Sequence, residues 1–204
     1  MSQITTGLRS VLSSPWVYDL LQDVMGARSA RKQLVREYVR PISKSRILDI
    51  GCGTARILDY LPEVDYHGFD LSQRYIDDAS RRYGARGFFR CTLLKQSLVD
   101  NLEHFDIVIA TGVLHHLDDD QAAGLIQLAH SALRNGGRLI TIDPCYADGQ
   151  NFFSRYLVSR DRGQNVRSDK QYPGLASTIF SQVKGEVKHR LFIPYTHWIM
   201  ECQK

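Results

Sequence analysis

Two carboxylates and a pair of glycines carry the most specific chemical signal in this sequence. Residues 47–55 read Ile-Leu-Asp-Ile-Gly-Cys-Gly-Thr-Ala, so Asp49 precedes Gly51 and Gly53. Glycines directly after a strand let the backbone turn sharply and approach a ligand without a Cβ clash. A second carboxylate, Asp70, stands 17 residues after Gly53, at the end of the next strand-like run. A carboxylate at that place can accept hydrogen bonds from both ribose hydroxyls, which favours a cofactor that contains a nucleoside.

The same loop argues against a dinucleotide. The dinucleotide fingerprint is G-x-G-x-x-G, and Arg56 occupies the position of its third glycine. The acidic Asp49 in front of the glycines also disfavours a pyrophosphate, whereas it suits the cationic amino group of an amino-acid tail.

Short apolar runs predict the buried strands that must position these residues. The first five runs are residues 46–50, 66–69, 88–91, 107–110 and 138–142. Helical patterns separate them, at Ile57–Leu61, at Tyr75–Tyr83 behind a possible Ser72 cap, and at Leu125–Leu133, which Asn135-Gly136-Gly137 stops. Such alternation is typical of right-handed βαβ units and of a mostly parallel sheet with both faces covered.

The two ends of the chain depart from this alternation. Two N-terminal helices are predicted, one after Ser14 and one over residues 29–39 that ends before Pro41. Residues 187–192 and 197–202 are strand-like and joined by a short link, which suits an antiparallel hairpin. We therefore expect one α/β domain over residues 1–204, with an N-terminal helical lid (1–45), a cofactor-binding core (46–144) and a substrate-side segment with the hairpin (145–204). The N-terminal helices would either cover the cofactor or simply pad the sheet.

Composition sets outer limits on function. The chain has 204 residues, 26 Lys and Arg, 22 Asp and Glu, and a net charge of +4. The charge is uneven: residues 1–46 carry +5, residues 47–150 carry −6 and residues 151–204 carry +5. A nucleic-acid binder usually shows a basic stripe or a larger surplus, so basic flanks around an acidic middle predict a positive rim that faces the acceptor.

Other sequence signals favour a cytoplasmic protein. The four cysteines are widely spaced and form no CxxC pair, so neither a disulfide framework nor a zinc site is indicated. No apolar run approaches the roughly 18–20 residues that span a bilayer. The N-terminus lacks the apolar stretch and cleavage site of a secretory signal.

Four motifs in a fixed order make the sequence resemble the class I S-adenosylmethionine-dependent methyltransferases over nearly its whole length. They are LDIGCGTA at 48–55, GFDLS at 68–72, FDIVIATGVLHHL at 105–117 and NGGRLITIDP at 135–144. One glycine motif alone would be weak, but four motifs at the spacing of this family are specific. The resemblance implies a Rossmann-like, doubly wound sheet of seven strands, mostly parallel, with one antiparallel strand from the C-terminal hairpin.

The resemblance also implies a role for each matching residue. The methionine part of S-adenosylmethionine would lie against Asp49, Gly51, Cys52 and Gly53 and, after the fourth strand, Thr111, Gly112 and Val113. Asp70 would bind the ribose, and Leu71 and Tyr75 would flank the adenine. Two positions depart from the family pattern: Ala55 replaces a frequent third glycine, and the end of the third strand lacks the acid that often binds the adenine amine. Either Thr92 and backbone groups replace that acid, or the matching residue lies one or two positions away.

Three residues are candidates for proton transfer. Methyl transfer from a sulfonium requires the protein mainly to position the acceptor and, where needed, to remove a proton. His116 and His115 follow the fourth strand and titrate near neutral pH, with His116 slightly preferred; one of them could instead cap or pack the next helix. Asp143 at the end of the fifth strand is the third candidate, or a turn-forming residue. We expect no metal, because Asp118–Asp120 suit the dipole of a helix N-terminus.

The basic stretch after Pro144 is the candidate acceptor site. It contains Arg160 and Arg162 together with Arg155 and Arg167, and Arg forks suit carboxylates and phosphates. Tyr195, on the hairpin, could reach the same cleft. The alternative is a solvated face whose arginines pair within the chain.

These observations favour an S-adenosylmethionine-dependent methyltransferase that acts on an O or N atom of a small, anionic or hydroxyl-rich acceptor of secondary or glycolipid metabolism. The expected partner is that small molecule, with no nucleic acid and no membrane span. An NAD(P)-dependent oxidoreductase on a similar sheet and a non-catalytic S-adenosylmethionine-binding protein remain as alternatives. Nucleic-acid methylation is a weaker one, because no Asn-Pro-Pro-Tyr-type motif is present.

Overall fold

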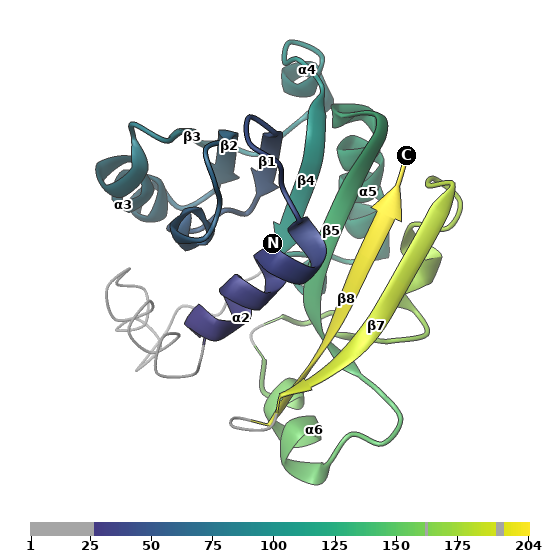
Figure 1. The fold of residues 1–204 in the computed structure, drawn as a ribbon. Helices are drawn as coiled ribbons and strands as arrows, with labels where there is room; N and C mark the ends of the chain where they lie inside the picture. The colour runs from purple at the N-terminus through teal and green to yellow at the C-terminus, as the bar shows by residue number, and fades with distance from the viewer. Residues whose placement is uncertain (1–26, 162, 191–193) are drawn as a thin grey trace.

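Strands and helices alternate along the chain in the computed structural model, which describes residues 27–161, 163–190 and 194–204 (Figure 1). The helical segments are α2 (Ala27–Leu34), η2 (Val35–Val39), η3 (Arg56–Asp59), α3 (Gln73–Tyr83), α4 (Gln96–Val99), η4 (Leu114–His116), α5 (Asp119–Ala132), α6 (Phe152–Ser159) and η5 (Tyr172–Leu175). The strands are β1 (Arg46–Ile50), β2 (Asp65–Asp70), β3 (Gly87–Cys91), β4 (Phe105–Thr111), β5 (Leu133–Tyr146), β6 (Arg167–Ser168), β7 (Gln182–Arg190) and β8 (Tyr195–Gln203). The helix expected after Ser14 lies outside the described residues.

One sheet in the order β3-β2-β1-β4-β5-β8-β7 forms the centre of the fold. Neighbouring strands from β3 to β5 are parallel, whereas β8 is antiparallel to both β5 and β7. This arrangement confirms the doubly wound fold and the antiparallel hairpin. The seven expected strands form the path, and the two-residue β6, which pairs with β5 beside it, is an addition that the sequence pattern did not predict.

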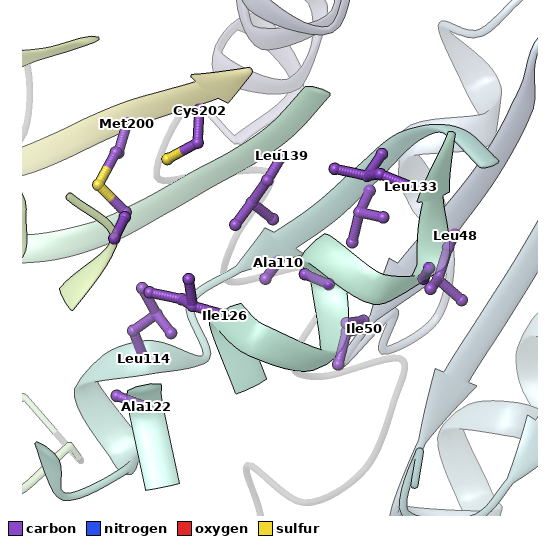
Figure 2. Close-up of a cluster of buried hydrophobic side chains, with 14 of the residues drawn as sticks. Leu48, Ile50, Ala110, Leu114, Ala122, Ile126, Leu133, Leu139, Met200 and Cys202 are labelled. Carbon is purple, nitrogen blue, oxygen red and sulfur yellow. The ribbon is translucent and has the colours of Figure 1, made fainter. Parts of the chain in front are cut away.

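Both faces of the sheet are covered, which explains why the central strands read as continuous apolar runs. On one face, α2, η2, η3 and α3 pack over Ile47, Ile107 and Ile140. On the other face, α5 packs over a cluster that includes Leu48 and Leu139, together with α4 and η5 (Figure 2). Alternating residues of one strand thus contribute to two separate cores.

Two helices end at earlier residues than the sequence pattern predicts. The stretch at Ile57–Leu61 forms only the short η3, because Pro62 disfavours a helical conformation at the residue before it. The helix expected up to Leu133 ends at Ala132, and Leu133 already pairs with Phe105 in the sheet. Asn135-Gly136-Gly137 therefore forms an irregularity in β5 rather than a helix cap.

The N-terminal helical stretch over residues 29–39 is confirmed as α2 and η2. Its last carbonyls, of Tyr38 and Val39, accept hydrogen bonds of 2.9 and 2.7 Å from the guanidinium of Arg138 on β5. Such bonds satisfy carbonyls that a helix end leaves without partners. In the described residues, no helix combines the length and the apolar character that crossing a membrane requires.

Candidate functional site

The loop after β1 turns through a left-handed backbone conformation. Gly51 and Gly53 have φ angles of +76° and +55°. A Cβ at Gly51 would lie 2.7 Å from Cγ2 of Val113, so this glycine also allows the loop after β4 to approach. Ala55 has a φ of 53° and is fully buried, so it adopts the conformation that glycine would adopt there, at a modest strain. The expected glycine turn is therefore present, and it contacts the end of β4.

Asp49 is a buried carboxylate with one oxygen in use. The hydroxyl of Tyr66 donates a 2.6 Å hydrogen bond to its Oδ2, while its Oδ1 is buried and has no hydrogen-bond partner in the described part of the chain. Burial raises the pKa of Asp49 to about 7, although the Tyr66 hydroxyl opposes this shift. A buried acceptor without a partner costs free energy. The amino group of a cofactor's amino-acid tail would supply the missing donor and the opposite charge.

Asp70 lies at the tip of β2, against the glycine turn. Its two oxygens accept hydrogen bonds from the backbone amides of Gly53, at 2.9 Å, and Ser72, at 2.8 Å. These amides fix the carboxylate at the edge of the sheet. Because each carboxylate oxygen has two acceptor positions, Asp70 can still accept from ribose hydroxyls. Ser72 is the N-cap residue of α3, as expected, but its side chain makes no capping hydrogen bond.

The residues expected around the adenine lie at the tips of β2 and β3. Leu71 and Leu93 are 50% and 51% exposed, which is high for leucine and leaves an apolar surface at this end of the sheet. Tyr75 and Thr92 are half-buried. The amide of Thr92 donates to the carbonyl of Asp70 at 3.0 Å, so the adenine-side and ribose-side residues are held together. The hydroxyl of Thr92 donates to the carbonyl of Leu93 at 3.5 Å.

The loop after β4 completes this edge. Thr111 is exposed, Gly112 has a φ of +68°, and Val113 packs against Gly51 as described above. The amide of Gly112 donates a 2.7 Å hydrogen bond to the carbonyl of Ile142 on β5. Cys52 is half-buried, and its thiol lies where a Cβ on Gly68 of β2 would stand. The cofactor residues predicted from the sequence thus come from the ends of adjacent strands.

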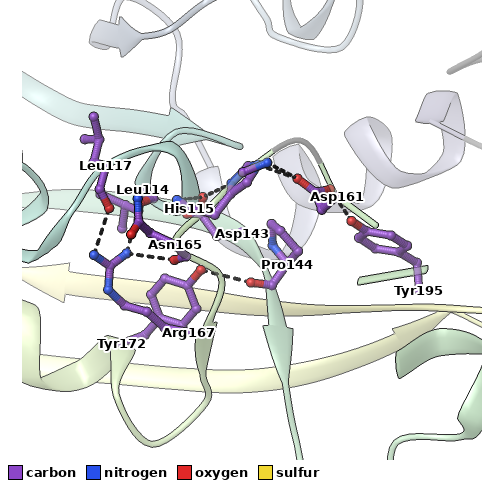
Figure 3. A network of polar contacts seen from close by, with 11 residues as sticks. Leu114, His115, Leu117, Asp143, Pro144, Asp161, Asn165, Arg167, Tyr172 and Tyr195 are labelled. Carbon is purple, nitrogen blue, oxygen red and sulfur yellow. Dashed lines mark hydrogen bonds and ion pairs between the residues drawn. The ribbon is translucent and has the colours of Figure 1, made fainter. Parts of the chain in front are cut away.

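His115 lies between two carboxylates (Figure 3). Its Nδ1 is 2.8 Å from Oδ1 of Asp143, and its Nε2 is 3.1 Å from Oδ1 of Asp161. Burial alone would lower the pKa of His115, but the hydrogen bonds to the two carboxylates outweigh burial and raise its pKa to about 9. At neutral pH this ring is therefore an imidazolium with both nitrogens engaged.

Asp143 is buried inside β5, three residues before the strand ends at Tyr146, and not in a turn. Its Oδ1 also accepts from the backbone amide of His115 at 3.2 Å. Burial raises its pKa, although His115 opposes the shift. His116 is half-buried, and its ring centroid lies 4.1 Å from that of His115. The three candidates for proton transfer therefore lie in one cluster, in which His115 and Asp143 are hydrogen-bonded to each other.

The arginines of the substrate-side segment separate into different roles. Arg167 is buried; it donates to the carbonyls of Leu114 and Leu117, both at 2.9 Å, and to Asp119 at 2.7 Å. Arg160 is exposed and lies over the ring of Tyr156, 5.4 Å from its centroid. Arg162 lies outside the described residues. Of the three described arginines, Arg155 and Arg160 have the exposure that contact with an acceptor requires, whereas Arg167 does not.

Tyr195, at the start of β8, donates its hydroxyl to Oδ2 of Asp161. The sequence pattern did not single out Asp161, whereas the structure makes it the bridge between His115 and Tyr195. It also did not identify Tyr66 as the donor to Asp49. The available signal was a tyrosine two residues before Gly68, on the strand that ends at Asp70.

Other acidic and thiol groups have structural roles. Asp118 caps α5 by accepting from the amide of Gln121 at 2.8 Å, as its position at a helix start predicts. Among the described residues, no group of three or more His, Cys, Asp or Glu side chains could hold a metal ion. All four cysteines are free thiols.

A hollow of about 250 Å³ lies between α2 and η3, lined by Arg28, Arg31, Arg56, Asp59 and Tyr60. It contains neither the carboxylates Asp49 and Asp70 nor the histidine cluster. This hollow is therefore separate from the candidate site at the ends of β1, β2 and β4.

Comparison with known proteins agrees with this geometry. Residues 48–139 match a family model described as a methyltransferase domain. The chain is 31% identical over 170 residues to a carboxy-S-adenosyl-L-methionine synthase from Helicobacter hepaticus, covering 78% of this chain and 67% of the relative. It spans only part of two other curated relatives: 25% of an uncharacterised Synechococcus protein (37% identity over 106 residues, 48% of this chain) and 2% of polyketide synthase ThaG from Burkholderia thailandensis (34% over 137 residues, 58% of this chain).

Solved structures share the fold at low sequence identity. An S-adenosylmethionine-dependent methyltransferase from Archaeoglobus fulgidus superimposes with a TM-score of 0.72 and 16% identity, covering 92% of this chain and 99% of that one. The N-methyltransferase NodS from Bradyrhizobium japonicum, solved with S-adenosylhomocysteine, has a TM-score of 0.66 and 17% identity, covering 87% of this chain and 86% of that one.

Proposed function

Because this chain belongs to the class I S-adenosylmethionine-dependent methyltransferase family, we propose that it transfers a methyl group to an O or N atom of a small-molecule acceptor. The observation that supports the proposal is the buried Oδ1 of Asp49 beside the glycine turn, to which no group of the described chain donates. Asp70, tied to the amide of Gly53 of the same turn, supplies the second anchor. Together they match a cofactor with a cationic amino-acid end and a free ribose.

The cofactor, when bound, supplies the activated methyl group, so the protein need only hold the two reactants in line and remove a proton where one leaves. Asp49, Gly51, Cys52, Gly53, Thr111, Gly112 and Val113 would lie along the methionine part, Asp70 along the ribose, and Leu71, Tyr75 and Thr92 around the adenine. The exposed leucines at the tips of β2 and β3 support an apolar adenine slot there.

We assign the role of general base to His116 rather than to His115 or Asp143. Both ring nitrogens of His115 are engaged by carboxylates, and Asp143 is buried with its Oδ1 committed to His115. These two residues are therefore better suited to shape the site than to accept the proton of an acceptor. A base is needed only if the acceptor atom carries a proton at neutral pH.

The acceptor is proposed to be anionic or hydroxyl-rich. Arg155 and Arg160 on the exposed side of α6 support this idea, as does the basic balance of residues 151–204. Phe152 and Phe153 are 77% and 70% exposed on the same short helix, so the acceptor would also carry an apolar part. The similarity to a polyketide synthase supports an acceptor from secondary metabolism.

The direct test is isothermal titration with S-adenosylhomocysteine, followed by incubation with S-adenosylmethionine and panels of phenolic, sugar and amine acceptors. Acceptor-dependent formation of S-adenosylhomocysteine supports methyl transfer. Binding without turnover on any acceptor favours the non-catalytic alternative, and consumption of S-adenosylmethionine without S-adenosylhomocysteine would indicate a different use of the cofactor. Binding of NADH in place of S-adenosylhomocysteine would contradict the proposal.

A further inference from the structure

Alternate residues of the segment after α6 contact the loop after β4. Asp161 bonds to the ring of His115, and a Cβ on Gly163 would lie 2.1 Å from Cδ2 of that ring. The amide of Asn165 donates to the carbonyl of His115 at 3.0 Å, and Arg167 donates to the carbonyls of the same loop. We call residues 161 and 163–167 the strap. Asp161, Asn165 and Arg167 of the strap lie beside Leu114, His115 and Leu117 of the segment between β4 and α5 (Figure 3).

We infer that Asp161 is a positioning residue, which acts through His115 to hold the strap on the loop after β4 and so fixes the wall of the acceptor site. The acceptor site named in this inference rests on the proposed function. The contact of Asp161 with His115 that holds the strap, which we call the clamp, does not. None of the four sequence motifs predicts this role for Asp161. The role follows from the contact between His115 and Asp161, which lie 46 positions apart in the chain.

The carboxylate of Asp161 accepts from three donors of the protein. Its Oδ1 accepts from the amide of Gly163 at 2.8 Å and from Nε2 of His115, and its Oδ2 accepts from the hydroxyl of Tyr195. The side chain is only 22% exposed. A carboxylate with these three donors is held in one orientation, which suits a residue that orders its neighbours rather than one that binds an acceptor.

His115 is linked to β5 through Asp143, and to the strap and β8 through Asp161. The groups that face its ring are Asp143 from β5, Asp161 from the segment after α6, the ring of His116 beside it, and Tyr195 of β8 through Asp161. Two carboxylates around one imidazolium favour its charged form. The clamp is consequently strongest while His115 is protonated, in agreement with its raised pKa of about 9.

The clamp can be tested with Asp161→Asn and a matched control. Asp148→Asn also exchanges a carboxylate for an amide close to α6, but Asp148 is exposed and pairs only with Lys170 among the described residues. The ring signals of His115, assigned with His115→Gln, give its pKa by NMR titration, and hydrogen exchange reports the amide of Asn165. Isothermal titration with S-adenosylhomocysteine provides the third readout.

We expect Asp161→Asn to lower the pKa of His115 by at least about 1 pH unit, which is a tenfold change in its protonation equilibrium. Exchange of the Asn165 amide should accelerate at least about tenfold, while the affinity for S-adenosylhomocysteine stays within about threefold of the wild type. Asp148→Asn should change none of the three. Tyr195→Phe, which keeps the carboxylate, should produce a smaller shift in the same direction and serves if Asp161→Asn does not fold.

An unchanged pKa of His115 in both Asp161→Asn and Tyr195→Phe would overturn the inference, as would an equal shift in Asp148→Asn. Loss of S-adenosylhomocysteine binding by a folded Asp161→Asn protein would also overturn it, because Asp161 would then serve the cofactor directly. If the wild type itself does not bind S-adenosylhomocysteine, the proposed function fails, while the titration of His115 still decides the role of Asp161.

Discussion

The hydroxyl of Tyr66 on β2 donates a 2.6 Å hydrogen bond to Asp49 on the adjacent strand β1, and it leaves the second oxygen of that buried carboxylate free to accept. This pair makes the methionine end of the proposed cofactor site sensitive to pH. Burial raises the pKa of Asp49 to about 7, so near neutrality a substantial fraction of the protein carries an uncharged carboxyl there.

The affinity for S-adenosylhomocysteine should therefore rise with pH. Only the ionised form of Asp49 attracts the ammonium group of the ligand, and this form increases as pH rises through about 7. Between about pH 5.5 and about pH 7, affinity should increase by up to about tenfold per pH unit and then level off. Titration calorimetry across this range checks the slope. Asp49→Asn should bind weakly and without this slope, and an equal slope in that variant would contradict the assignment.

Tyr66→Phe should move this transition to higher pH. The tyrosine hydroxyl stabilises the ionised carboxylate, so its loss raises the pKa of Asp49 further and weakens binding at pH 7 by several-fold, for a hydrogen bond worth about 1 kcal/mol. Tyr83→Phe is the matched control, because its hydroxyl donates to Asp59, away from the turn. Equal pH midpoints for Tyr66→Phe and the wild type would exclude the role given to Tyr66.

Gly51→Ala should abolish or strongly weaken binding of S-adenosylhomocysteine. The φ of +76° strains any side chain, and the added Cβ would lie 2.7 Å from Cγ2 of Val113, so either the Val113 side chain or its loop must shift. A destabilisation of about 1–3 kcal/mol in urea unfolding is also expected. Gly124→Ala, in α5 with nothing within 4 Å of the new Cβ, should be neutral or stabilising by up to about 1 kcal/mol. Normal binding by Gly51→Ala would contradict the close approach of the two loops.

Arg167→Met should destabilise the fold, because the carbonyls of Leu114 and Leu117 and the carboxylate of Asp119 each lose a bond to its guanidinium. The two carbonyls are buried, and leaving a buried acceptor without its donor costs about 1–3 kcal/mol each, whereas the Asp119 side chain is 84% exposed and can be solvated. Arg155→Met, an exposed arginine of α6, should change the unfolding free energy by less than about 0.5 kcal/mol. If both variants unfold at the same urea concentration, Arg167 is not the structural residue described here.

Stability should also fall at alkaline pH because of His115. Its pKa is raised above the unfolded value, so its contribution is complete below about pH 6.5 and is lost as pH rises through about 9. Urea unfolding at a series of pH values checks this loss in the wild type. His115→Gln should show a flatter profile, and an identical profile would assign the alkaline loss to another group.

Local sequence patterns predicted the elements of this fold well, because alternating apolar runs and glycine turns act over a few residues. The strands β1 to β5 and the hairpin of β7 and β8 overlap the runs that predicted them, and the turn at Gly51 and Gly53 is present, but β5 and β7 each begin five residues earlier than predicted. The length of η3 and the end of α5 were missed. In both cases a neighbouring constraint, Pro62 or the pairing of Leu133 with Phe105, decided where the helix stops.

The chemistry of the acceptor side depends on contacts between distant residues, which no local pattern encodes. Arg167 resembles any other arginine of its basic stretch in sequence, yet it is buried against a loop about 50 residues earlier. Asp161 and Tyr195 likewise become partners of His115 only after the strap and β8 have packed. The cofactor side could be predicted because its residues follow strand ends that the topology brings together.

The most direct test of the central claim is the affinity of S-adenosylhomocysteine for Asp70→Ala, measured by isothermal titration beside Asp77→Ala, an exposed carboxylate of α3. Loss of the ribose contacts should weaken binding by about tenfold or more in Asp70→Ala, and by less than about twofold in Asp77→Ala. Equal affinities for the wild type and a folded Asp70→Ala protein would mean that the ribose is not held at the tip of β2, and the proposed cofactor site would be wrong.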